Sequence, residues 1–250
     1  MTVELLIYFI LLALLSEIVG TVGGFGSSML FVPIAGYFLD FHSVLGVTAI
    51  YHLSSNISKI YFFRDGFDKK LVINMGITSI LFVILGAFLS KSISSKLLEL
   101  LLALFLISLS VLLLFFRNKR LKPTRTNAIL GGSISGFTAG LLGTGGAIRG
   151  VVLASYGLQA NVFIATSALI DLGIDASRSV VYSLNGFVHK DDLYLIPILL
   201  IVSFTGTYIG KKIVNLMSEK QFQTMVLLLI LITGVVTLFK AIPLTILQKS

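Results

Sequence analysis

GTVGGFG at residues 20–26 and GLLGTGG at residues 140–146 are glycine-rich strings set among apolar runs. The apolar pieces beside them, 25–39, 128–142 and 147–158, would each reach only about 18–23 Å as helix, less than a full membrane crossing. Apolar runs broken by clustered glycines at membrane depth predict discontinuous helices, whose unwound backbone must line a cavity or lie buried in protein. The two strings therefore predict broken or re-entrant helices at two places in one chain.

The composition excludes a soluble globular protein. Of the 250 residues, 56% are hydrophobic and 12% are charged, and the mean hydropathy is +1.01. No soluble shape of this size has enough interior to hide that much apolar side chain. The chain is expected to be an integral membrane protein.

Several kinds of site and partner are also disfavoured. The chain has no Cys, which excludes disulfides and thiolate sites, and its three His are scattered, so we expect no metal and no cofactor. The net charge of +8 comes from basic residues in short loops, which is the positive-inside pattern of a membrane protein and does not indicate nucleic-acid binding. The start, MTVELLIYF, has an acid where a signal peptide would be basic, and no P-loop is present.

Seven further runs are long enough to cross the roughly 30 Å hydrocarbon core of a bilayer. Most carry almost no charge, whereas the runs at 41–63 and 161–181 have ionisable groups in their middles. The seven runs are 3–19, 41–63, 71–89, 97–116, 161–181, 193–209 and 222–239.

The sequence repeats itself at a shift of 120 residues. This shift places Gly20 on Gly140 and Gly23 on Gly143, and it also aligns Gly26 with Gly146, Gly66-Phe67 with Gly186-Phe187, Gly86 with Gly206 and Lys91 with Lys211. We therefore predict an all-α membrane protein of about eight transmembrane helices in two homologous repeats, each opening with a glycine-broken or re-entrant helix.

The predicted organisation is a first membrane repeat at 1–116, a basic cytoplasmic linker at 117–126, a second repeat at 127–240 and a short tail at 241–250. With the linker inside, 11 of 16 loop and terminal basic residues lie inside whether the repeats are parallel or inverted. We favour inverted repeats, because two-fold-related halves with broken helices at the centre are a common transporter plan.

Each repeat also carries a polar stripe along one helix. In the second repeat the stripe is spaced i, i+4, i+8, i+11, and a shift of 119 reproduces it in the first. Asp175 and Arg178 alternatively form an ion pair that joins helices, and His52 and Asn56 alternatively serve as hydrogen-bonding links between helices. The two stripes are Ser167, Asp171, Asp175 and Arg178, and Thr48, His52, Asn56 and Lys59.

The glycine strings predict an anion site. A helix that begins just after a break presents free N–H donors and the positive end of its dipole. Gly26-Ser27-Ser28 begins one such helix, and Gly146-Ala147-Ile148-Arg149 begins the other, with Arg149 adding a planar cation suited to an oxyanion. The alternative is that the glycines only allow close helix packing.

These residues resemble the TauE/SafE sulfite-exporter family of membrane permeases. The likeness rests on two half-repeats that each open with G-x-x-G-x-(G/F)-G, followed by GVTA at 46–49 and ATSA at 165–168. It covers nearly the whole chain and implies transport of sulfite, sulfonates, sulfoacetate-like compounds or other small sulfur-containing anions across the cytoplasmic membrane. Phe25 stands where the family often has Gly, and Leu153 replaces the Pro that the first repeat has at Pro33.

The sequence thus predicts a secondary transporter of a small anion in the cell membrane, not an enzyme, with the substrate near the midplane between the broken helices. The alternatives are a passive anion channel, a permease for small carboxylates and, far less favoured, an intramembrane hydrolase using Ser27 and His52. The predicted substrate-binding residues are Gly23, Gly26, Ser27, Ser28, Thr48, His52, Asn56, Gly143, Thr144, Gly146, Arg149, Ser167, Asp171, Asp175 and Arg178.

The coupling ion is left open. An inside-negative potential favours anion export by about 2.3 kcal/mol per charge per 100 mV, so an exporter needs no proton. We favour export, in which case Asp171 serves structure more than coupling. In an importer, Asp171 or His52 would carry a coupling proton. The expected partners are the anion, the lipid bilayer and, for an importer, protons, and the sequence is compatible with a homo-oligomer.

Overall fold

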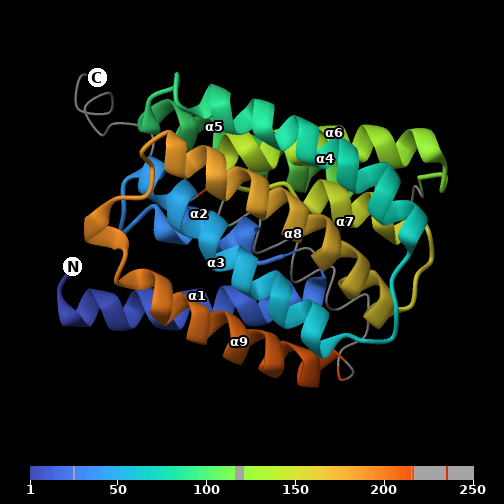
Figure 1. The fold of residues 1–250 in the computed structure, drawn as a ribbon, viewed down its shortest axis with the longest axis horizontal. Coiled ribbons are helices and arrows are strands. Elements are labelled where there is room, and N and C mark those ends of the chain that lie inside the picture. Colours follow the sequence, from blue (N-terminus) through green and yellow to red (C-terminus); the bar gives the residue numbers. More distant parts are fainter. Residues whose placement is uncertain (25, 116–120, 215, 217–234, 236–250) are drawn as a thin grey trace.

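A computed structural model describes residues 1–24, 26–115, 121–214, 216 and 235. In these residues the fold is helical, without strands (Figure 1). The elements are α1 (Val3–Gly23), α2 (Ser28–Ala35), α3 (Phe41–Phe62), α4 (Lys69–Ser90), α5 (Ser95–Phe115), α6 (Arg125–Leu142), α7 (Gly146–Ala154), α8 (Ala160–Leu184), the 3₁₀ helix η1 (Lys190–Asp192) and α9 (Leu195–Val214).

Five of the described helices are long and apolar enough to cross a membrane, namely α1, α4, α5, α8 and α9. They coincide with five of the runs that the sequence predicted. Phe25, linker residues 117–120, most of the predicted span 222–239 and the tail 241–250 lie outside the described residues. The boundaries of the two predicted repeats stay a prediction.

Polar caps fix where several helices begin. The Asp40 carboxylate accepts hydrogen bonds from the backbone N–H groups of His42 and Ser43 at the start of α3, and Asp68 does the same for Leu71 at the start of α4. Burial alone would raise the pKa of Asp40, but these N–H groups, the Ser43 hydroxyl and the nearby His189 hold it below its usual value. The stabilisation from this cap is therefore present at neutral pH and is lost only as the pH falls through the lowered pKa.

The glycine strings end one helix and begin the next. Helix α1 is followed by Gly24 with φ 65° and Gly26 with φ 84°, and α6 is followed by Gly143 with φ 78°. This left-handed backbone conformation is open to glycine and strained for other residues. The chain then turns into the short helices α2 and α7.

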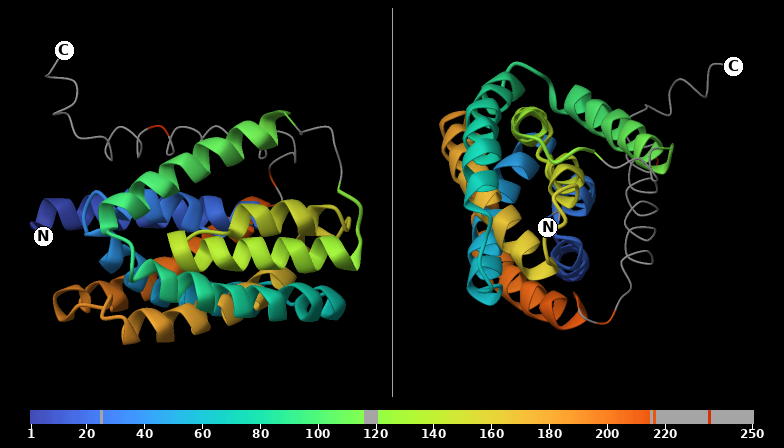
Figure 2. Two further views of the ribbon diagram at one scale, coloured as in Figure 1. Left: turned by 90° about the horizontal axis from the view of Figure 1, so that it is seen from above. Right: turned by 90° about the vertical axis from the view of Figure 1, so that its right-hand side faces the viewer.

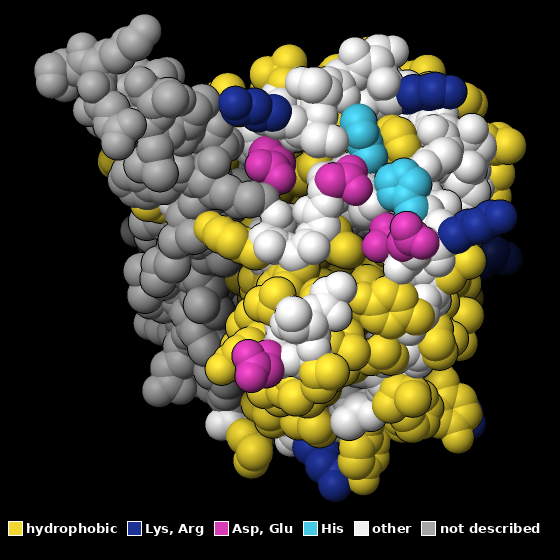
Figure 3. Space-filling model, turned by 90° about the vertical axis from the view of Figure 1, so that its left-hand side faces the viewer, with side chains coloured by type: hydrophobic (Ala, Val, Ile, Leu, Met, Phe, Trp, Pro, Cys, Tyr) yellow, Lys and Arg dark blue, Asp and Glu magenta, His cyan; other side chains and the backbone are white. Residues whose placement is uncertain are grey.

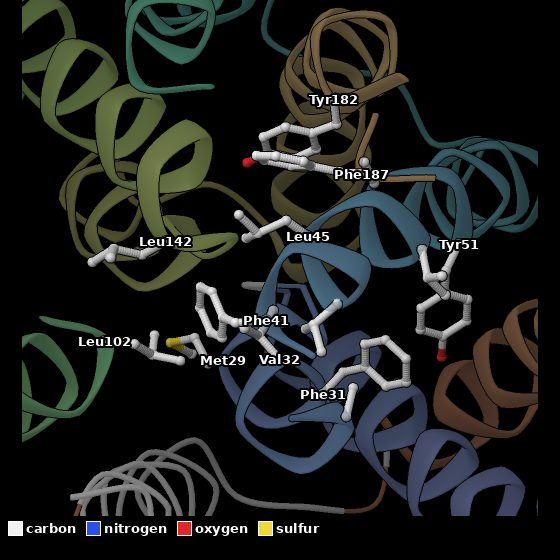
Figure 4. Close-up of a cluster of buried hydrophobic side chains, with 14 of the residues drawn as sticks. Met29, Phe31, Val32, Phe41, Leu45, Tyr51, Leu102, Leu142, Tyr182 and Phe187 are labelled. Atoms are coloured by element: carbon white, nitrogen blue, oxygen red, sulfur yellow. The ribbon is translucent and has the colours of Figure 1, made fainter. Parts of the chain in front are cut away.

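The short helices are enclosed by protein. Every residue of α2 except Ile34 is buried. Figure 4 shows Met29 and Val32 of α2 in a cluster with Phe41 of α3 and Leu102 of α5. Broken helices at membrane depth need such enclosure, because lipid offers no partners for their exposed backbone groups.

The long helices lie along roughly one common direction, and α3 and α8 pack side by side between α4 and α9 (Figures 1 and 2). Helix α1 packs on α9, and α6 packs on α4. The figures also show that α1 and α6 run in opposite directions, as do α3 and α8, and α4 and α9.

The outer surface is largely apolar along the helices. Leu81 and Leu85 of α4 and Ile201 of α9 are each more than half exposed, as expected of side chains that face lipid. Figure 3 views one end of the bundle, where Asp or Glu, His, and Lys or Arg side chains lie among the hydrophobic ones. Apolar side chains along the helices and charged side chains at the end of the bundle are typical of a multi-pass membrane protein.

Small residues allow α4 and α6 to pack closely. A β-carbon on Gly136 of α6 would overlap the backbone of Ser79, and one on Gly140 would overlap the backbone of Val83. By contrast, a β-carbon on Gly76 of α4 would make an ordinary contact of 3.8 Å with Ile170.

We expect Gly136→Ala to lower the free energy of unfolding by about 1–3 kcal/mol, because α4 and α6 must move apart. Gly76→Ala is the matched control, and we expect it to be neutral or slightly stabilising, since alanine favours helix. Thermal unfolding of the two variants in detergent measures the difference. Equal stability of both would contradict the close α4–α6 packing.

Candidate functional site: a charged cavity between the two helix breaks

A polar cavity lies where the two glycine breaks meet the central helices α3 and α8. Its lining comes from both breaks and from the polar stripes of both central helices. The lining residues are Gly26, Ser27, Ser28, His52, Ser55, Asn56, Lys59, Ala139, Gly143, Gly145, Gly146, Arg149, Asp171, Ile174, Asp175 and Arg178.

Most of the residues that the sequence proposed for the site line this cavity. Four do not: Thr144 and Ser167 bond residues that line it, Gly23 ends α1, and Thr48 is buried on α3. Within the described residues, the Thr48 hydroxyl has no hydrogen-bond partner. The residues that line it are Gly26, Ser27, Ser28, His52, Asn56, Gly143, Gly146, Arg149, Asp171, Asp175 and Arg178.

The two breaks touch each other. The Ser28 hydroxyl at the start of α2 lies 3.2 Å from the Thr144 hydroxyl, two residues before the start of α7. The short helices therefore begin side by side at the cavity, with the positive ends of their dipoles directed at it.

The ion pair between Asp175 and Arg178, which the sequence offered as an alternative role for these residues, is present. Arg178 Nε donates to Asp175 Oδ1 at 2.7 Å, and Asn56 Nδ2 of α3 donates to Asp175 Oδ2, also at 2.7 Å. Arg178 also donates to the carbonyl of Gly143 at 2.8 Å, at the end of α6. A cation at the negative end of a helix is favourable, so Arg178 holds the break after α6 in place.

A second ion pair joins α7 to α8. Arg149, in the first turn of α7, pairs with Asp171 and donates from Nε to the Ser167 hydroxyl at 3.1 Å. The Arg149 side chain is 2% exposed and the Asp171 side chain 14%. The sequence placed both residues in the site but did not predict that they pair, because they lie on different helices.

The sequence did not predict a third ion pair beside the cavity. Lys59 of α3 lies 2.9 Å from Glu17 of α1, and the Glu17 side chain is fully buried. Glu17 also accepts hydrogen bonds from four hydroxyl groups, those of Thr21, Ser27, Ser55 and Thr207. Both residues are charged and lie within apolar runs. Because burying an unpaired charge is costly, the sequence could have indicated that these two residues pair with each other.

A hydrogen-bond chain connects two of these pairs. Arg178 Nη2 lies 3.1 Å from His52 Nδ1, His52 Nε2 lies 2.9 Å from the Ser27 hydroxyl, and that hydroxyl donates to Glu17 at 2.6 Å. Arginine can only donate, so His52 Nδ1 accepts, and the ring proton sits on Nε2 and is donated to Ser27. The Ser27 proton points to Glu17 and not to His52, so the geometry is not that of a serine nucleophile activated by histidine.

The cavity is narrow. The space open to the centre of a water molecule is about 20 Å³, close to what one or two water molecules need. An anion of four heavy atoms needs more room, so groups that line the cavity must move for it to bind.

A bundle of membrane-spanning helices around an enclosed, charge-lined cavity defines a multi-pass membrane protein with an internal polar site. Comparison with known proteins identifies the family. The sequence model of the sulfite exporter TauE/SafE family matches residues 9–237, and the chain therefore belongs to this family.

A curated relative is also described as a membrane transporter. The chain is 26% identical over 240 residues to the probable membrane transporter protein YdhB of Bacillus subtilis (strain 168), covering 90% of this chain and 97% of YdhB. No solved structure matches the chain significantly. The chain is thus a multi-pass membrane transporter of the cell membrane.

Removing one partner of the Lys59–Glu17 pair leaves a buried charge uncompensated. We expect Lys59→Met to lower the free energy of unfolding by about 3–5 kcal/mol, whereas the double variant Glu17→Gln, Lys59→Met should recover part of that loss. A double-mutant cycle of unfolding in detergent measures the coupling. Additive effects of the two substitutions would show that the pair does not interact.

Proposed function

We propose that this protein is a secondary transporter of small sulfur-containing oxyanions, such as sulfite or sulfonates, which bind between the two helix breaks. The observation that carries the proposal is Arg149, a buried guanidinium in the first turn of α7 that lines the cavity at the second break. Membership of the sulfite exporter family supports the substrate class.

The chemistry of the cavity suits an oxyanion. A guanidinium offers two parallel N–H donors that match the oxygens of a sulfonate or sulfite. The first backbone N–H groups of α2 and α7 have no partners within their helices and point toward the same region. The hydroxyls of Ser27 and Ser28 and the Arg149 guanidinium are all bonded within the protein, so an anion must compete for these donors with the groups that they already bond.

We further propose that the two halves are inverted repeats. The correspondence that the sequence predicts pairs α1 with α6, α3 with α8 and α4 with α9, and the members of each pair run in opposite directions (Figures 1 and 2). The packing of α1 on α9 is then the counterpart of the packing of α6 on α4. Rocking of one half against the other would open the narrow cavity to each side in turn, which is the usual route of alternating access.

Export is the direction that we propose. A singly charged anion is driven outward by an inside-negative membrane potential, at about 2.3 kcal/mol per 100 mV. A passive anion channel is the alternative, and it would pass current far faster than a conformational cycle allows. A permease for small carboxylates is a second alternative, since a carboxylate also fits a guanidinium.

The test is a thermal-shift screen of the purified protein with sulfite, thiosulfate, sulfoacetate, taurine, sulfate and short carboxylates. A bound ligand at 100 times its Kd should stabilise the protein by about 2.7 kcal/mol. We expect the sulfur oxyanions to stabilise the wild type. Arg149→Gln should lose some stability, because it leaves Asp171 without its partner, and it should also lose the response to these anions.

Arg178→Gln is the matched control, because it removes the same charged group from the same cavity and also breaks an ion pair, here with Asp175, together with the bonds to the end of α6. This variant should lose stability before any ligand is added. A full ligand response in Arg149→Gln would remove Arg149 from the site, and a response to carboxylates alone would replace the proposed substrate class.

A further inference from the structure

The carboxylate of Asp171 lies where the proposed anion would bind. It pairs with Arg149 in the first turn of α7. Its Oδ2 atom also lies 3.8 Å from where a β-carbon on Gly26 would stand, so the carboxylate lies near the break that precedes α2 as well. Asp171 thus pairs with a residue of the second break and lies near the first, between which the substrate is proposed to bind.

Asp171 is also the least anchored of the three buried acids. Among the described residues it receives a hydrogen bond from Arg149 alone. Asp175 is bonded by both Arg178 and Asn56, and Glu17 by Lys59 and four hydroxyls. The side chain of Asp171 is 14% exposed, whereas those of Glu17 and Asp175 are 0% and 4% exposed.

The charges of the cavity region balance without a substrate. Lys59, Arg149 and Arg178 are each paired with one carboxylate in the described residues. An anion that binds Arg149 must therefore displace Asp171 and leave one buried negative charge without its partner, which weakens binding.

We propose that Asp171 is an internal competitor of the substrate, a tethered carboxylate that holds the place of the anion on Arg149 and expels it at the end of each transport cycle. This inference rests on the proposed function, because it assigns a role to Asp171 at the same anion site. It explains how a site with a buried guanidinium can release an anion quickly. The Asp171 carboxylate returns to Arg149 and takes the place of the substrate, which then leaves the cavity.

The experiment uses the full chain in detergent for binding and in vesicles for transport, with methanesulfonate as the probe because its charge does not change with pH. We expect Asp171→Asn to bind methanesulfonate at least about tenfold more tightly than the wild type, or ~1.4 kcal/mol, and to turn over more slowly. Lower KM together with lower kcat is a result that a merely structural role for Asp171 would not produce.

Two controls isolate the competing charge. Asp171→Glu keeps a carboxylate at this position and should not show the tightening, and Asp175→Asn removes a carboxylate that does not contact Arg149 and should lose stability without a gain in affinity. Asp171→Ser removes the same charge and gives a second measurement if Asp171→Asn does not fold. Unchanged or weaker binding in the charge-removing variants would overturn the inference.

The two proposals fail in different ways. If the wild type binds methanesulfonate and Arg149→Gln does not, but neither charge-removing variant at Asp171 binds more tightly, then the competitor role is wrong and the anion site stands. If the wild type binds no sulfur oxyanion at all, the proposed function fails and the inference fails with it.

Discussion

The structure depends on one constraint: charges inside a membrane protein must be neutralised by neighbouring groups. A charge at membrane depth costs at least ~2.5–3.5 kcal/mol on insertion scales, so isolated charges are rarely kept there. Among the residues that the structure describes, six such charges form the pairs Lys59–Glu17, Arg149–Asp171 and Arg178–Asp175. The first pair links α1 to α3, and the second links α7 to α8. The third pair lies within α8, and its Arg178 also bonds the carbonyl of Gly143 at the end of α6. Together these contacts hold the shape of the cavity.

The second constraint is the backbone itself. The glycines after α1 and α6 let the chain leave the helix, and the enclosing side chains keep lipid away from the exposed N–H and C=O groups. The breaks and the ion pairs support each other, since Arg178 bonds the carbonyl that α6 exposes at Gly143, and Arg149 projects from the first turn of α7. The result is a charged cavity, the proposed anion site, whose charge and position arise from the same residues that hold the fold.

Local patterns in the sequence were sufficient to predict the five membrane-spanning helices described above and to suggest one ion pair. Asp175 and Arg178 are three residues apart on one helix, so their contact follows from helix geometry, and it is present. Helix ends were less accurate, because hydropathy ignores polar caps: α6 begins at Arg125 after the cap Thr124, three residues before the apolar run at 128. Pairs between helices could not be assigned, since Arg149–Asp171 and Lys59–Glu17 depend on how α7 packs on α8 and α1 lies against α3. The correct partners emerge only once the fold brings these helices together.

The central claim is that an oxyanion binds to Arg149 between the starts of α2 and α7. The most direct test is a crystal structure of the protein grown with selenite, the heavier analogue of sulfite, in which anomalous scattering from selenium locates the anion. We expect one strong anomalous peak within hydrogen-bonding distance of the Arg149 guanidinium, with the Asp171 carboxylate moved away from it. A peak elsewhere in the bundle, with Arg149 still paired to Asp171, would contradict the account.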